Sequence, residues 1–137
     1  MWANFWAAVS ALSSTATLGV AVWAMFRWRK QEELKAKQDF KKAVGVLTDT
    51  LAQLPLIFKD DEHIREYSDR LDDLTSRFVS AAHAWHCTEG MLDKNKTIND
   101  SWGKVDDLIA DYVAGKCERT PISEACGIIL RAKFVFK

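Results

Sequence analysis

The side chains best suited to chemistry in this chain lie in one run, the residues HAWHC at 83–87. On a helix His83 lies one turn from both His86 and Cys87, so two nitrogen or sulfur ligands would share a face. Zinc prefers four such ligands in a tetrahedron, and Cys117 and Cys126 are the remaining thiols. The nine-residue step between those cysteines is not a usual finger spacing, and no CxxC pair is present. The five residues are therefore weak metal candidates, and free, partly buried thiols beside surface histidines are the favoured interpretation.

Nucleophilic catalysis has little support in the sequence. A nucleophile needs a base and an orienting acid beside it, but Cys87 directly follows His86, and successive side chains on a helix point apart. Asp107 and Asp111 lie one turn apart, which is common on charged helix surfaces. The motifs GxGxxG, HExxH and GxSxG are missing, as is a phosphate-binding loop. We predict no catalytic residues and no cofactor, and a small metal-dependent enzyme is the weakest alternative.

The elements that would position these residues are helices. Apolar residues recur at alternating steps of four and three in two seams: Phe40, Val44, Leu47, Leu51 and Leu54, and then Ile64, Tyr67, Leu71, Leu74, Phe78, Ala81 and Trp85. This heptad spacing, as in coiled coils, places each set on one helix face. Pro55 ends the first helix, because its ring clashes with the preceding turn. The sequence thus predicts an antiparallel hairpin whose second helix runs over about 61–88, with Asp60 as N-cap.

Two shorter helices are predicted to follow. The first covers about 99–115 and places five apolar residues on one face, namely Trp102, Val105, Leu108, Ile109 and Tyr112. The second has Thr120 as N-cap and Pro121 at its first position, and it runs to about Phe134. Apart from a short candidate strand at 133–137, no period-two alternation is present. The predicted fold class is all-α: one N-terminal transmembrane helix, then a cytosolic antiparallel helical hairpin or small helical bundle.

The N-terminal segment has the features of a membrane span. Residues 5–26 are 22 residues without a charge, enough for roughly 33 Å of helix against a hydrocarbon core of about 30 Å. Tryptophans lie at both ends, at positions 2, 6, 23 and 28, as interfacial anchors do. Arg27, Arg29 and Lys30 follow at once and mark the cytosolic flank. We predict an anchor at 1–28 and a cytoplasmic helical domain at 29–137, with the N-terminus outside. A cleaved signal peptide and a buried helix of a soluble domain are the alternatives.

Small side chains form a ridge on this span. Ala7, Ala11, Thr15 and Gly19 lie four residues apart, with Ser10 and Ser14 beside them. Helices in lipid associate by close packing of such ridges and by Ser/Thr hydrogen bonds. Two interpretations have equal weight: the face builds a homo-oligomer, or it contacts only membrane lipid.

The charge distribution separates two parts of the chain. The 19 basic and 19 acidic residues cancel, which argues against a general nucleic-acid partner. Residues 27–59 carry net +4 and residues 60–137 carry net −4. The basic part suits an anionic inner leaflet, so Arg131 and Lys133 join Arg27, Arg29 and Lys30 as predicted membrane-surface residues. The acidic residues Asp69, Asp72 and Asp73 are predicted to face a protein partner. Three cysteines at irregular spacing suit a reducing compartment.

The Ala/Ser/Thr-rich span, bracketed by Trp and followed by a charged helix, resembles those of many small bacterial and phage membrane proteins. Some of those belong to defence or lysis systems. The resemblance covers residues 1–30 and transfers no functional residue. It implies a protein of a bacterial inner membrane that self-assembles or recruits a partner, for example a membrane-acting effector. The alternative is a passive single-pass scaffold that tethers a cytosolic enzyme.

Overall fold

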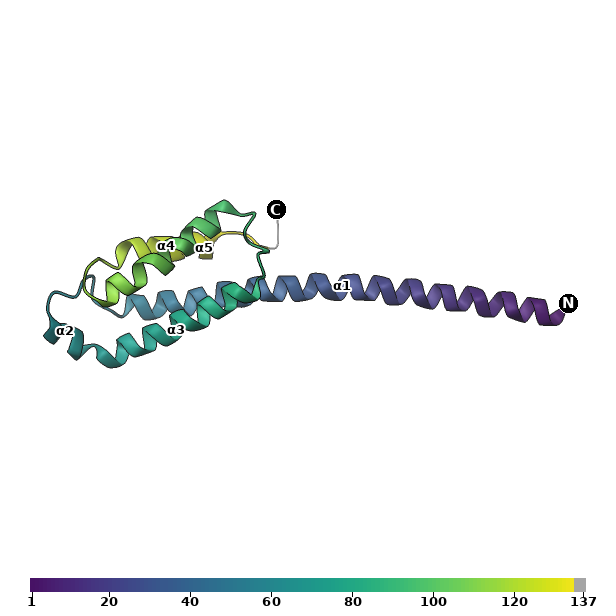
Figure 1. Ribbon diagram of the computed structural model, residues 1–137, viewed down its shortest axis with the longest axis horizontal. Coiled ribbons are helices and arrows are strands. Elements are labelled where there is room, and N and C mark those ends of the chain that lie inside the picture. Colours follow the sequence, from purple (N-terminus) through teal and green to yellow (C-terminus); the bar gives the residue numbers. More distant parts are fainter. Residues whose placement is uncertain (135–137) are drawn as a thin grey trace. The chain divides into compact units, whose positions relative to one another are not determined.

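The computed structural model describes residues 1–134, which contain helices and no strand (Figure 1). The helices are α1 (Trp2–Ala52), α2 (Asp61–Glu66), α3 (Ser68–Cys87), α4 (Lys96–Val113) and α5 (Thr120–Arg131). The predicted all-α class is confirmed. The candidate strand at 133–137 is wrong for Lys133 and Phe134, and its last three residues lie outside the described part. The chain divides into two compact units, Met1–Glu33 and Leu34–Lys137.

The helix predicted over 61–88 is interrupted once. Tyr67 separates α2 from α3, with φ −99° and ψ 13°. Its ring packs at 6.1 Å from the ring of Phe58 and at 5.2 Å from that of His63, and this tertiary contact accompanies the local departure from helical geometry. Asp60 has the extended conformation of an N-cap, but its side chain makes no capping hydrogen bond. The prediction was therefore right about the cap position and wrong about the unbroken helix.

The ends of the last two helices also differ from the prediction. α4 begins three residues earlier than predicted, because the Asn95 side chain accepts a hydrogen bond from the Ile98 N–H at 3.4 Å and caps it. α5 includes Thr120 as its first residue, so the N-cap is Arg119. α5 stops at Arg131 and not at Phe134.

The second unit is a small helical bundle whose helices alternate in direction (Figure 1). Phe40 on α1 contacts Trp85, near the end of α3, whereas Gln53 beyond the other end of α1 accepts a hydrogen bond from Arg70, near the start of α3. Those two segments are therefore antiparallel, as predicted. The first seam is confirmed as core, since its five residues are at most 3% exposed. α5 adds residues that the sequence patterns did not single out as core: Ile122, Ala125, Cys126 and Ile129.

An aromatic cluster joins three of the helices. The Phe40 ring centroid lies 5.1 Å from that of Trp85 on α3 and 5.3 Å from that of Trp102 on α4. Trp102 also stacks on Phe78, at 5.8 Å and an interplanar angle of 20°. Offset and edge-to-face contacts of this kind each add roughly 0.5–1.5 kcal/mol beyond the area they bury. The cluster therefore fixes how α1, α3 and α4 pack.

Arg119 closes the C-terminal end of α1. Helix ends leave carbonyl groups without intrahelical partners. One Arg119 guanidinium nitrogen donates to the carbonyl oxygens of Leu51, Ala52 and Leu54, at 2.9, 3.0 and 2.6 Å. Beside it the Tyr112 hydroxyl donates to the Pro55 carbonyl at 2.6 Å. Burial raises the pKa of Tyr112 to about 12, although Arg119 acts in the opposite direction.

A second contact between segments distant in sequence lies at the other end of the bundle. The Lys41 ammonium group donates to the carbonyl oxygen of Ala132, just beyond α5, at 2.9 Å. The same ammonium lies 5.3 Å from the ring centroid of Phe134. This pair of contacts holds the chain after α5 against α1.

Candidate functional site

The candidate span, residues 5–26 of α1, is exposed along its whole length. α1 contains an 18-residue window with mean hydropathy 1.5 and no residue buried, long and apolar enough to cross a membrane. Among the described residues no other helix meets that criterion. The four flanking tryptophans are each at least 60% exposed. Such an apolar surface is unfavourable in water.

Four of the five hydroxyl side chains inside the candidate span donate hydrogen bonds within the helix. The hydroxyls of Ser14 and Thr15 donate to backbone carbonyls four residues earlier, at 2.9 and 2.8 Å. Thr17 does the same with Ser13, at 2.8 Å, and Ser13 donates to the Ser10 carbonyl at 3.0 Å. Hydroxyls bonded in this way are compatible with a hydrocarbon environment, because each of these four donors has a partner.

The predicted small-residue face consists of Ala7, Ala11, Thr15, Gly19, Ser10 and Ser14, all of which are exposed. A methyl group added at Gly19 would meet no other atom within 4 Å. A shallow hollow on the same helix is lined by Ser13, Ser14, Thr17, Leu18 and Ala21. It shares Ser14 with the predicted face, and its other lining residues lie outside the set predicted for that face. The spacing of Ser14, Thr17 and Ala21, three and then four residues, places these three on one side of the helix.

The predicted membrane-surface residues lie in different surroundings. Arg27, Arg29 and Lys30 are exposed, and the Arg27 guanidinium lies 5.3 Å from the Trp23 ring centroid. Arg131 is exposed and donates to the Gly127 carbonyl at 3.2 Å. Lys133 lines a cavity in the helical unit together with lysines from other segments. The sequence patterns did not reveal that cavity.

The weak metal candidates do not form a cluster. His83, His86 and Cys87 are exposed, Cys117 is half-buried and Cys126 is buried. Within residues 1–134 no three His, Cys, Asp or Glu side chains come together as a metal site requires. Burial raises the pKa of the Cys126 thiol to about 11 and also raises that of Cys117. Their surroundings therefore do not favour the thiolate, which is the form that binds a metal.

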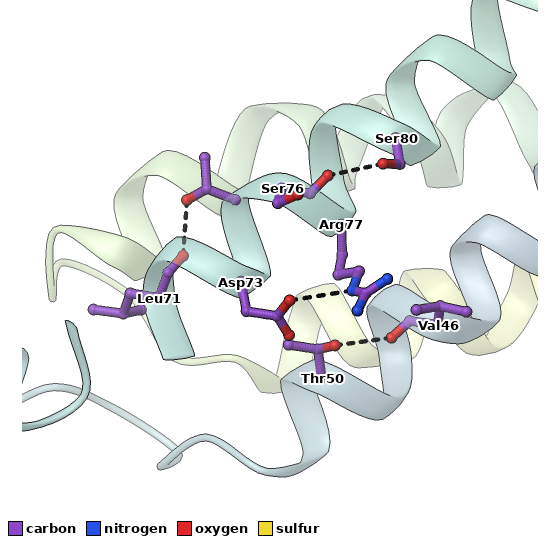
Figure 2. Close-up of polar contacts among 8 residues, drawn as sticks. Val46, Thr50, Leu71, Asp73, Ser76, Arg77 and Ser80 are labelled. Atoms are coloured by element: carbon purple, nitrogen blue, oxygen red, sulfur yellow. Dashed lines mark hydrogen bonds and ion pairs between the residues drawn. The ribbon is translucent and has the colours of Figure 1, made fainter. Parts of the chain in front are cut away.

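The three aspartates predicted to face a partner are exposed on α3. Asp73 is engaged within its own helix, since its carboxylate lies 3.3 Å from the Arg77 Nε. Figure 2 shows this pair on the side of α3 toward Val46 and Thr50 of α1. Asp69 and Asp72 make no salt bridge among the described residues. An exposed pair of this kind contributes well under 1 kcal/mol.

Comparison with known proteins finds no match of any kind: no family model, no curated protein and no solved structure.

Proposed function

We propose that this protein is a single-pass membrane protein that assembles through its span and holds its helical unit at the inner face of a bacterial membrane. The observation that carries the proposal is the 22-residue uncharged run in α1, in which every residue is exposed. A bilayer is the environment that would cover such a surface.

The proposed orientation follows from the charges at the two ends of the run. Three basic residues lie within four positions after Phe26, whereas no basic side chain precedes Phe5. An excess of Lys and Arg marks the cytosolic flank of a span, so the N-terminus is proposed to face outward. The free thiols agree with a helical unit in a reducing compartment.

Self-assembly is proposed through the small side chains of the span. Small residues let two helix backbones approach closely, and close packing is what drives helix association in lipid. Gly19 offers open space for such an approach. A membrane-acting effector is the version of this proposal in which the assembly itself acts on the bilayer.

A matched pair of substitutions tests the assembly. Ala11 and Gly19 lie on the predicted face, and Ala24 is displaced from each of them by about 140° around the helix, at roughly 100° per residue. We expect Ala11→Leu, combined with Gly19→Leu, to convert a defined oligomer into monomer, because the larger side chains separate the helices. Ala24→Leu should leave the oligomer intact. The measurement is the protein mass of the detergent-solubilised full chain by light scattering.

An unchanged mass for the Ala11→Leu/Gly19→Leu chain would rule out this face as the assembly surface. A monomeric wild-type chain would rule out self-assembly altogether and would favour a passive scaffold. For a scaffold, a polyleucine span would replace the natural one without loss of function, whereas changes at Asp69 and Asp72 would matter.

A further inference from the structure

A cavity lined by lysines lies at the end of the helical unit where α3 leads into α4 and where α5 ends. Its volume is about 490 Å³. The residues that line it are Lys37, Met91, Leu92, Lys94, Asn95, Lys96, Lys133 and Phe134, and we call it the lysine cavity. Its four lysines come from α1, from the α3–α4 connection with the start of α4, and from the chain after α5. The fold, and not sequence adjacency, therefore concentrates positive charge there.

Within residues 1–134 none of these four lysines forms a salt bridge with a carboxylate. The salt bridge within residues 1–134 joins Asp73 and Arg77, far along α3 from the cavity in sequence. Asp93 neighbours Lys94 in the chain but does not line the cavity. The residues that line the cavity thus include four lysines and no carboxylate, and this excess of positive charge favours an anion.

The start of α4 adds to this preference. Lys94 and Lys96 flank the N-cap Asn95, and the first turn of α4 contains no acidic residue. The N-terminus of a helix carries partial positive charge, so cations are unfavourable there and anions are favourable. A bound anion would offset the repulsion between these two lysines and the positive end of α4, a repulsion that otherwise destabilises the fold.

The apolar part of the lining indicates what kind of anion fits. Met91, Leu92 and Phe134 share the cavity with the lysines, and Lys41 holds Phe134 in place. A free inorganic phosphate has no apolar part to bury against apolar side chains. A phosphate attached to a glycerol and acyl chains does have such a part. The mixed lining therefore favours an amphiphile.

The position of the cavity in the chain agrees with a lipid ligand. Lys37 follows Phe26, the last residue of the uncharged run, by eleven positions. Eleven residues reach at most about 40 Å however the chain is arranged. Wherever residues 5–26 cross a bilayer, Lys37 therefore lies within about 40 Å of the end of the uncharged run.

We propose that the lysine cavity binds the phosphate group of an anionic membrane phospholipid, with Met91, Leu92 and Phe134 against its glycerol and upper acyl chains. This inference rests on the proposed membrane anchoring. It goes further by giving the helical unit its own lipid contact. The strength with which the unit binds the membrane would then depend on the membrane's content of anionic lipid.

The test uses the full chain in a neutral detergent and native mass spectrometry to count bound lipids. Phosphatidylglycerol and phosphatidylcholine are titrated separately into the wild type and two variants. Lys94→Gln with Lys96→Gln removes two cavity lysines, and Lys104→Gln with Lys116→Gln removes two exposed lysines that do not line the cavity. We expect phosphatidylglycerol to bind the wild type more tightly than phosphatidylcholine. The cavity variant should lose roughly 30-fold in phosphatidylglycerol affinity, about fivefold per lysine, and the control variant less than about twofold.

Three results would overturn the proposal. They are equal affinity for the two lipids, equal loss in the two variants, and binding of inorganic phosphate or glycerol phosphate as tight as that of the lipid, which would make the ligand a soluble anion. Retention in membranes after alkaline carbonate washing is measured in parallel. A retained chain without lipid preference contradicts only the cavity, whereas an extracted wild type contradicts the anchoring itself.

Thermal unfolding supplies a readout that a purely structural lysine would not give. We expect Lys96→Gln alone to raise the lipid-free unfolding midpoint by roughly 1–4 °C, because it removes a cation from a helix N-terminus. The same variant should bind phosphatidylglycerol more weakly. A lowered midpoint would show that Lys96 stabilises the fold without an anion, and it would contradict the proposal.

Discussion

At the scale of single residues, the side chains that matter most for the fold make unusual backbone contacts. Arg119 is half-buried, yet one of its nitrogens serves three carbonyl groups at the end of α1. Tyr112 is fully buried, and its hydroxyl donates a hydrogen bond to a fourth carbonyl group, that of Pro55. Neither role is visible in the sequence, because both partners are more than fifty residues away and accept through backbone atoms.

We expect Arg119→Met to lower the free energy of unfolding by about 2–4 kcal/mol, because it leaves several carbonyl groups without a charged donor. Arg131→Met is the matched control, since Arg131 is exposed and donates to a single carbonyl four residues back. That change should cost less than about 0.5 kcal/mol. The measurement is urea unfolding of the full chain in detergent, followed by near-ultraviolet circular dichroism of the aromatic cluster. Equal destabilisation by the two variants would contradict the capping role of Arg119.

At the scale of elements, the sequence predicted helix type and core faces better than helix ends. The first seam is buried throughout, because its heptad pattern is long and uninterrupted. The break in the helix at Tyr67 was not predicted, because it accompanies contacts of Tyr67 with Phe58 and His63. The spacing of apolar residues along the sequence does not reveal those contacts. The early start of α4 was missed because the Asn95 cap is a single side chain. The lysine cavity needed three distant segments to be brought together, so residue spacing gave no signal for it.

The length of α1 leads to a prediction about its exchange behaviour. Residues 27–33 are all exposed, whereas residues 40–51 contain the buried seam. Local opening of an exposed helical segment costs far less than opening of a core segment. We expect backbone amides at 27–33 to exchange with deuterium on the order of 100-fold faster than those at 40–51, by mass spectrometry of the full chain in detergent. Uniform protection across both segments would mean that the exposed part of α1 is covered by something else, such as a second copy.

At the scale of the whole molecule, the central claim is that residues 5–26 cross a membrane and leave the helical unit in the cytosol. The chain supplies its own probe of this topology. Cys87 is exposed on the helical unit, whereas Cys126 is buried with a raised pKa and should react slowly. Cys117 is half-buried, and changing it to serine leaves exposed Cys87 and buried Cys126 as the thiols of the described residues.

The most direct test is therefore labelling of Cys87 in the Cys117→Ser chain with a membrane-impermeant maleimide, before and after cell lysis. The comparison chain carries Ala3→Cys together with Cys87→Ser and Cys117→Ser. Our account predicts that Cys87 is labelled only after lysis and that the cysteine at position 3 is labelled in intact cells. Labelling of Cys87 in intact cells, or protection of position 3 until lysis, would contradict it.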